Sequence, residues 1–207
     1  MAEKVDGRRA RGDRTRTATA TAAAEIATVT GLDSISMSGL ARATGFSPSG
    51  ILTVFDNREA IQLAAVERAR ERFVAEVVTP SWGARPGLPR LRKLVDNWFD
   101  YVDRRVFPGG CFLVATSVEY GAQQGPVADA VRELKQTWLN LLEGELRVGA
   151  GDSRRARDRA RMTVFRLDAF MVAADIATRL TGDGEYMAMG RTSCRDLLAS
   201  YRLAERG

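Results

Sequence analysis

Apolar residues recur at three- and four-residue steps along most of the chain, which is the pattern of amphipathic helices. The clearest stripe follows Pro89 and is made of Leu91, Leu94, Val95, Trp98 and Val102. Residues 79–87 and 107–110 are rich in proline and glycine and read as loops. No segment alternates convincingly as a strand does, so the pattern predicts an all-α fold of about nine helices.

The longer predicted helices are separated by these loops and by Gly-Pro or Gly-Asp-Gly breaks. They cover residues 58–78, 89 to the FPGG at 107–110, 111–120, a segment from 126 onward, 153–180 and 184–204. The helix at 58–78 is expected to end before Pro80, which cannot donate a backbone hydrogen bond.

Residues 37–56, MSGLARATGFSPSGILTVFD, predict two short helices that cross at a tight turn. Gly45 suits the turn, because glycine readily adopts the positive φ that ends a helix sharply. Ser47 is the expected N-cap of the second helix, and Pro48 is its expected first residue. A structural αα-hairpin has the same spacing, so this pattern leaves both a plain hairpin and a DNA-binding helix-turn-helix open.

The run from about Thr17 to Phe73 resembles the N-terminal DNA-binding domain of the TetR family of transcriptional regulators. Residues 47–64, SPSGILTVFDNREAIQLA, are similar to the family pattern S-K-S-G-L-F-x-H-F-x-S-K-E-A-L-Q-L-A. Residues 108–120, PGGCFLVATSVEY, resemble a segment common in one branch of the family. The resemblance implies a helix-turn-helix DNA-binding domain at residues 15–60 and a ligand-binding and dimerisation domain at residues 61–207.

By this resemblance the protein is a sequence-specific DNA-binding regulator. Most members of the family are repressors, although some activate. The resemblance therefore implies a repressor that an unknown small molecule releases from a palindromic operator. Three positions depart from the pattern, because Pro48, Leu52 and Val54 stand where relatives carry Lys, an aromatic residue and His, which commonly contact phosphates. The departures keep open a helical sensor or interaction module with weakened DNA binding. The residues expected to contact double-stranded DNA are Ser38, Ser47, Pro48, Ser49, Gly50, Thr53, Arg58, Arg14 and Arg16.

Charge along the chain indicates where further contacts to phosphate would come from. From Thr17 to Ala60, two basic residues face four acidic residues, although phosphate neutralisation supplies much of the affinity for DNA. Residues 8–16 hold five arginines against Asp13 alone. We therefore expect residues 1–14 to form a disordered basic arm that contacts DNA, with a solubilising tail as the alternative.

The chain contains no histidine, which excludes Ser-His-Asp and Cys-His relays and removes the commonest zinc ligand. We predict no catalytic residues, metal or cofactor; an all-α enzyme using a carboxylate is the remaining alternative. Cys111 and Cys194 are expected to be buried, reduced thiols, with redox sensing by Cys111 as the alternative. No apolar run follows the basic N-terminus or reaches the ~20 residues that span a membrane, so we expect a cytoplasmic protein without membrane contact.

Large side chains in the helical body could surround one effector cavity, although such residues are also ordinary core. Glu119 and Asp168 lie within apolar helical runs, where an unpaired carboxylate is costly. Each is expected either to bind a polar or cationic ligand or to form an ion pair. For Asp168 the partner would be Arg161, Arg166 or an arginine across a dimer interface. The candidate ligand-binding residues are Trp98, Phe99, Phe112, Glu119, Tyr120, Trp138, Phe165 and Asp168.

A single recognition helix reads too few base pairs for useful specificity, so we expect a homodimer whose two heads read two half-sites. The last two predicted helices carry apolar residues that could form a four-helix contact across a two-fold axis. The same residues could pack within one subunit. The candidate dimer residues are Val172, Ile176, Leu180, Leu197, Leu198 and Tyr201.

Overall fold

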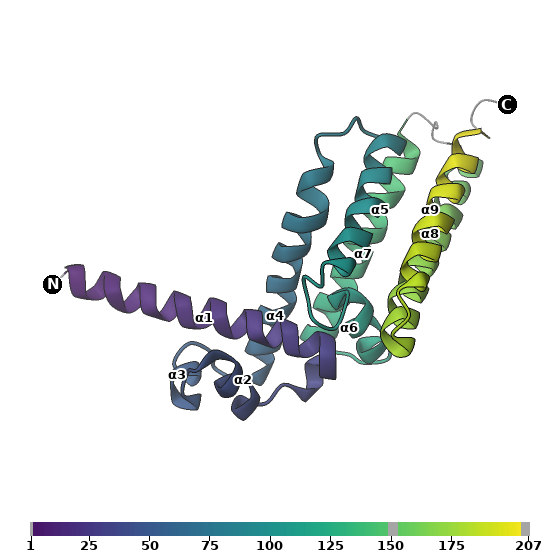
Figure 1. The fold of residues 1–207 in the computed structure, drawn as a ribbon. Coiled ribbons are helices and arrows are strands. Elements are labelled where there is room, and N and C mark those ends of the chain that lie inside the picture. Colours follow the sequence, from purple (N-terminus) through teal and green to yellow (C-terminus); the bar gives the residue numbers. More distant parts are fainter. Residues whose placement is uncertain (1, 149–152, 204–207) are drawn as a thin grey trace. The chain divides into compact units, whose positions relative to one another are not determined.

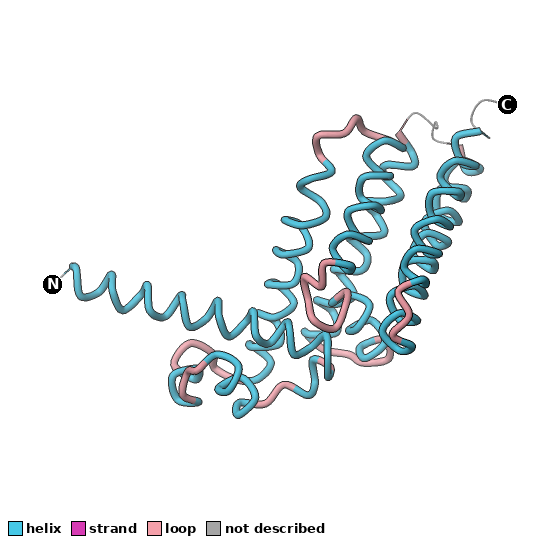
Figure 2. The backbone as a smooth tube through the Cα atoms, in the orientation of Figure 1, coloured by secondary structure: helices cyan, strands magenta, loops and turns pink. Residues whose placement is uncertain are grey.

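The computed structural model describes residues 2–148 and 153–203, and within these residues it contains nine α-helices and no strand (Figures 1 and 2). This confirms the predicted all-α fold. The helices are α1 (Ala2–Thr30), α2 (Met37–Thr44), α3 (Pro48–Leu52), α4 (Arg58–Phe73), α5 (Leu88–Asp103), α6 (Phe112–Tyr120), α7 (Pro126–Arg147), α8 (Arg154–Thr181) and α9 (Glu185–Leu203). None of these described helices is both long and apolar enough to cross a membrane.

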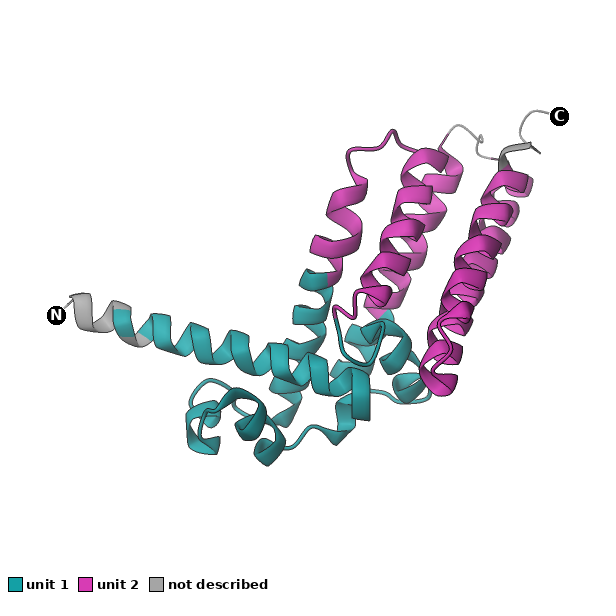
Figure 3. Cartoon of the chain, in the orientation of Figure 1, with its two compact units in different colours: residues 1–72, 107–132 teal, residues 73–106, 133–207 magenta. Residues whose placement is uncertain are grey.

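The chain forms two compact units (Figure 3). The first unit holds residues 1–72 and 107–132, and the second holds residues 73–106 and 133–207. Segment 107–132, with α6 and the first turns of α7, therefore groups with the N-terminal helices. The sequence predicted one domain boundary near residue 60, which would have placed segment 107–132 with the C-terminal helices.

The segment expected to be a disordered arm is helical from Ala2 and continues directly into the rest of α1. Residues 20–27 contribute several fully buried alanines, so the C-terminal half of α1 is held by packing. From such a nucleus each added residue gains one hydrogen bond, and alanine and arginine are favourable helix formers. Met1 and the side chains of residues 2–6 and of Arg8 lie outside the described residues.

The two short helices of the first unit begin and end as their local sequence predicts. Ser36 caps α2 by accepting a hydrogen bond from the Gly39 N–H at 3.1 Å, and α2 ends at Gly45 with φ of 73°. Ser47 caps α3 by accepting from the Gly50 N–H at 3.1 Å, with Pro48 in the first turn. These observations confirm the expected roles of Gly45, Ser47 and Pro48.

The predicted helix at 58–78 is α-helical as far as Phe73 and continues as a π-helical segment over Val74–Val78. A short 3-10 turn follows at Thr79–Ser81, which contains Pro80. In the second unit, α5 buries its predicted stripe, and Leu91, Leu94, Val95 and Trp98 are each at most 2% exposed. Helices α8 and α9 pack side by side in the same unit (Figure 1).

Candidate functional site

The α2–α3 pair presents an exposed surface made largely of short polar side chains. Ser38, Ser47, Ser49 and Thr53 are all exposed, and so is Pro48, while Gly50 is half-buried. The hydroxyls of Ser47 and Ser49 lie 3.1 Å apart, and Thr53 donates to the Gly50 carbonyl at 2.6 Å. Hydroxyls of this kind can both donate and accept, which suits contacts with base edges and phosphates.

Beneath this surface, Leu40 and Ile51 are fully buried and hold the two helices together. Two of the departures from the family pattern differ in their placement, because Leu52 is 54% exposed and Val54 is half-buried. Leu52 therefore offers an apolar side chain to solvent at the end of α3, where it cannot act as a hydrogen-bond donor.

Arginines of α1 lie beside the end of α3. Arg16 donates to the backbone carbonyl of Val54, and its guanidinium lies 4.7 Å from the centre of the Phe55 ring. Farther along α1, Arg9, Arg11 and Arg14 are exposed. Arg9, Arg11 and Arg14, which were expected in a disordered arm, are therefore carried on helix α1.

Arg58, expected to contact phosphate, is engaged within its own unit. It donates to the backbone carbonyl of Asp33, and its Nη2 lies 4.0 Å from the Asp33 Oδ1. About half of the Arg58 side chain, 53%, is exposed. A contact with DNA would have to share this guanidinium with the Asp33 backbone.

Two candidate ligand residues on α6, Glu119 and Tyr120, are bound to the turn between α1 and α2. The Glu119 carboxylate oxygens accept the N–H groups of Leu32 and Asp33, each at 2.7 Å. Tyr120 donates its hydroxyl to Asp33 Oδ1 at 2.5 Å. The carboxylate of Glu119 is therefore satisfied by backbone donors, which corrects the expectation of an effector ligand or an ion pair.

Asp33 is the centre of this polar network, and the sequence did not single it out. Gln62 donates to its Oδ1 at 3.0 Å and Gln123 to its Oδ2 at 3.1 Å. The hydrogen bond from Tyr120, followed by that from Gln123, lowers the pKa of Asp33. Burial and the adjacent Asp33 raise the pKa of Tyr120. Both groups are therefore held in the protonation states that make the strongest mutual hydrogen bond.

The aromatic candidates divide between the two units. Phe112 is buried in the first unit, and Phe165 is 69% exposed. Trp98 and Trp138 are buried in the second unit, where Trp98 meets Phe99 edge to face at 5.0 Å. The buried aromatic residues pack as ordinary core, which was the alternative interpretation.

Trp138 and Asp168 also have partners inside the second unit. The Trp138 ring meets Phe73 edge to face at 5.1 Å. Asp168 accepts from the Lys135 Nζ at 2.6 Å. The ion pair considered for Asp168 therefore exists, but its partner is Lys135 on α7 rather than Arg161 or Arg166, because helix packing brings the two distant residues together.

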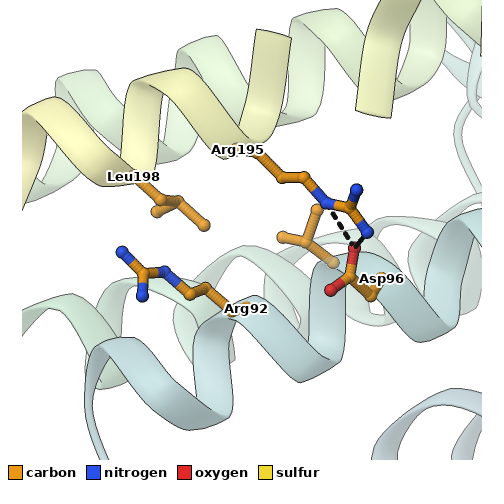
Figure 4. A pocket seen from close by; sticks show the side chains of 5 residues that line it. Arg92, Asp96, Arg195 and Leu198 are labelled. Atoms are coloured by element: carbon orange, nitrogen blue, oxygen red, sulfur yellow. Dashed lines mark hydrogen bonds and ion pairs between the residues drawn. The ribbon is translucent and has the colours of Figure 1, made fainter. Parts of the chain in front are cut away.

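A surface cavity of about 260 Å³ lies between α5 and α9 in the second unit (Figure 4). Arg195 donates to Asp96 at 2.8 Å, and Arg191 lies 3.8 Å from the same carboxylate. The acidic group of the cavity is thus already occupied by arginines. None of its lining residues was among the candidate ligand-binding residues; they are Arg92, Val95, Asp96, Arg195 and Leu198.

Helices α8 and α9 expose large apolar side chains, among which Leu180 is 83% exposed. On α8 the separations between these residues are 3, 11 and 4 positions, close to whole turns, so they form one stripe. The exposed apolar residues of the two helices are Met162, Phe165, Ile176, Leu180, Tyr186 and Met189. We call this set the α8–α9 apolar face.

The candidate dimer residues divide between this face and the subunit core. Ile176 and Leu180 are exposed, while Val172 and Leu197 are half-buried. Leu198 is fully buried, and the buried Tyr201 donates its hydroxyl to the Leu146 carbonyl at 3.1 Å. Leu198 and Tyr201 therefore belong to the core of one subunit and are not available to a second one, which corrects their assignment.

Both cysteines are buried, as expected. Burial raises the pKa of the Cys194 thiol to about 12, which keeps this group protonated and unreactive. Within the described part of the chain, no three Cys, Asp or Glu side chains gather as metal ligands do.

The chain matches a protein family described as "Tetracyclin repressor-like, C-terminal domain" over residues 87–194, just over half of its 207 residues. No curated protein matches the sequence. A TetR-family transcriptional regulator from Cytophaga hutchinsonii has a similar structure, with a TM-score of 0.77, 22% identity and coverage of 91% of this chain and 95% of that chain. A TetR-family transcriptional regulator from Streptomyces coelicolor is also similar, with a TM-score of 0.74 and 21% identity. The match covers 91% of this chain and 96% of that chain. The chain belongs to the TetR family of transcriptional regulators.

Proposed function

We propose that the protein is a ligand-responsive, sequence-specific DNA-binding repressor that acts on a palindromic operator as a homodimer. Members of its family are DNA-binding transcriptional regulators rather than enzymes. The observation that carries the proposal is the serine-capped helix α3, which follows a positive-φ turn and leaves an exposed face of hydroxyls. That face is the part of a helix-turn-helix that enters the major groove.

Recognition by this face uses short side chains. Ser49 and Thr53 reach only close partners, so direct base contacts are few, and DNA shape and bridging water carry part of the specificity. The exposed arginines of α1 add phosphate contacts to a hairpin whose single basic residue is Arg42. Arg16, which is attached to Val54, fixes these cations next to the reading helix.

Dimerisation through the α8–α9 apolar face accounts for its exposure. Phe165 and Leu180 are 69% and 83% exposed, and large apolar patches of this kind mark protein interfaces. Two copies related by a two-fold axis would bury both stripes in a four-helix contact. The paired heads would then read two half-sites of one palindrome.

Release from DNA follows from a second conformation. A small molecule that binds better to a state in which the heads no longer match successive major grooves lowers operator affinity by that difference in binding free energy. The family match over residues 87–194, a C-terminal domain, supports this part of the chain as the effector-binding part.

The test is the selection of bound sequences from a random duplex pool at about 150 mM salt. The full chain is compared with a variant lacking residues 1–14, which removes the exposed Arg9, Arg11 and Arg14 but leaves Arg16. An enriched palindrome supports the proposal and gives the half-site spacing. The truncated chain is expected to bind the same palindrome more weakly and with a flatter dependence on salt, because fewer counterions are released.

Failure of the full chain to enrich any sequence would contradict DNA recognition and favour the alternative, a helical sensor or interaction module. The alternative has one structural argument, the apolar Leu52 exposed at the end of α3. An unchanged salt dependence after truncation would leave the operator in place but contradict the role of the α1 arginines.

A further inference from the structure

Segment 107–123 of the first unit is joined to the end of α1 and the following turn at two places. At one, the Gly109 N–H donates to the Thr28 Oγ1 at 3.1 Å. A Cβ at Gly109 would overlap the Thr28 backbone, so only glycine allows this approach. At the other, Glu119 and Tyr120 bind the turn Leu32–Ser34. The chain passes from this turn to α2 within two residues, Ile35 and Ser36.

The turn Leu32–Ser34 is a 3-10 helix that lacks a cap from its own sequence. Its N-cap position is Gly31, and no side chain at that end accepts a hydrogen bond locally. The Glu119 carboxylate, 87 residues away in sequence from Leu32, accepts the first two N–H groups instead. It therefore does what an N-cap side chain does at a helix start, with the added strength of a charged acceptor.

The other groups around the turn strengthen the same arrangement. Tyr120 donates to the Asp33 side chain at 2.5 Å, and Gln62 of α4 donates to the Leu32 carbonyl at 3.2 Å. Leu32 itself is fully buried, so its backbone groups need partners inside the protein. We call Glu119 and Tyr120, with the Leu32 and Asp33 groups that they bind, the turn clamp.

We propose that Glu119 and Tyr120 are positioning residues for DNA binding, and that operator affinity falls when the turn clamp is open. The clamp fixes the turn that leads into α2, and α2 and α3 are the reading hairpin. With the clamp open, the hairpin must be ordered when DNA binds, and that ordering costs affinity. The inference rests on the proposed DNA-binding function and adds two residues outside the reading hairpin on which operator affinity depends.

For the loss of the Glu119 charge, the proposal predicts a change in DNA affinity opposite to the one that simple electrostatics predicts. Removing a carboxylate from a DNA-binding unit reduces repulsion of phosphate and by charge alone strengthens binding. Glu119→Gln removes the same charge but also weakens the cap on Leu32 and Asp33. The clamp therefore predicts weaker binding from a change that makes the unit less acidic.

The experiment compares Glu119→Gln and Tyr120→Phe with Asp129→Asn, using the full chain and its selected operator. Asp129 is exposed on α7 in the same unit and pairs with Arg132 on its own helix, so it matches the charge change without touching the turn. We expect Kd to rise about tenfold for Glu119→Gln, which replaces the carboxylate that accepts two N–H groups. We expect a rise of about threefold for Tyr120→Phe, because Asp33 keeps its hydrogen bonds from Gln62 and Gln123. Asp129→Asn is expected to leave Kd unchanged or lower it.

A second readout separates positioning from general stability. Hydrogen–deuterium exchange of the peptide containing Leu32 and Asp33 is expected to accelerate in Glu119→Gln, while peptides from α8 and α9 keep wild-type rates. Glu119→Asp keeps the charge but shortens the side chain, so it is expected to behave like Glu119→Gln and not like the wild type.

Two failures are distinguishable. A wild-type protein that binds no DNA sequence contradicts the proposed function itself. A wild-type protein that binds its operator, together with a Glu119→Gln variant that binds as tightly as Asp129→Asn, overturns the positioning role alone. Faster exchange at Leu32 and Asp33 without any change in Kd also overturns it, because the clamp would then be only structural.

Discussion

The two helical hairpins of the protein, α2–α3 and α8–α9, solve the same folding problem but expose opposite chemistry. Each hairpin buries one apolar face, including Leu40 and Ile51 in the first and Met171 and Leu198 in the second. The remaining face of α2–α3 carries hydroxyls such as those of Ser49 and Thr53, whereas that of α8–α9 carries Phe165 and Leu180 among other apolar groups.

The exposed face of each hairpin indicates what kind of partner it binds, whereas the buried face does not. A packed apolar face says only that a helix belongs to a core. An exposed polar face on a short helix suits a wet, charged partner such as DNA, while an exposed apolar face suits a protein surface that excludes water. Each hairpin should therefore depend for its function on the chemistry that it exposes.

The largest effect is expected at the α8–α9 apolar face. The double variant Phe165→Asp and Leu180→Asp would place carboxylates in an interface without partners for them, which is costly. We expect the chain to sediment as a monomer of 22.6 kDa and operator affinity to fall by about a hundredfold, because one head reads only one half-site. Analytical ultracentrifugation and an operator-binding titration measure the two outcomes.

Val148→Asp is the control, because Val148, the residue after α7, is 51% exposed but lies outside that face. It is expected to leave both the sedimenting mass and the operator affinity unchanged. If the double variant remained a dimer, the α8–α9 apolar face would not be the dimer contact. The chemistry that this hairpin exposes would then not identify its partner.

Local signals predicted most of the fold. Gly45, Ser47 and Pro48 act on backbone groups within a few residues of themselves, so the start and end of the α2–α3 hairpin are encoded where they occur. The stripe on α5 was likewise visible, because a period near 3.6 residues marks a buried face regardless of what it packs against.

The partners of charged residues were much less predictable. Glu119 binds backbone groups 86 and 87 residues away, and Asp168 binds Lys135, 33 residues away. Such pairs depend on how helices pack, which periodicity does not contain. On α9 the apolar residues follow one helical pattern, so the pattern could not separate the buried Leu198 and Tyr201 from residues available to a second subunit.

A smaller effect is expected at the exposed face of α3. Ser49→Asp adds a negative charge at the second helical position, where a carboxylate favours the helix itself. Any loss of affinity therefore reports on DNA contact and not on unfolding. We expect Kd for the operator to rise about tenfold through repulsion of phosphate. Gln136→Glu, at an exposed position of α7, adds the same charge elsewhere and is expected to leave Kd nearly unchanged.

Equal effects of Ser49→Asp and Gln136→Glu would mean that α3 is no closer to DNA than α7 is. The polar face of α2–α3 would then be an ordinary solvated surface. The contrast between the two hairpins would reduce to one apolar interface on an otherwise unremarkable helical protein.

The smallest effect is expected in the turn that holds the α2–α3 hairpin. Hydrogen bonds, first that from Tyr120, lower the pKa of Asp33 below its ordinary value of 3.8. The ionised form is therefore favoured in the native state, so its stabilisation is present above that ordinary pKa and is lost as pH falls through the lower native one. Because about half of the Asp33 side chain is exposed, we expect its contribution to the free energy of unfolding to be under ~1 kcal/mol.

Urea denaturation of the wild type and Asp33→Asn at about pH 7 and about pH 3 measures this contribution. The wild type is expected to be the more stable protein at the higher pH, and the difference is expected to shrink at the lower pH. A difference that persisted unchanged in acid would show that the carboxylate charge is not what Tyr120 and Gln123 stabilise. The hydrogen-bond geometry around Asp33, which an asparagine alters at any pH, would then be the property that holds the turn.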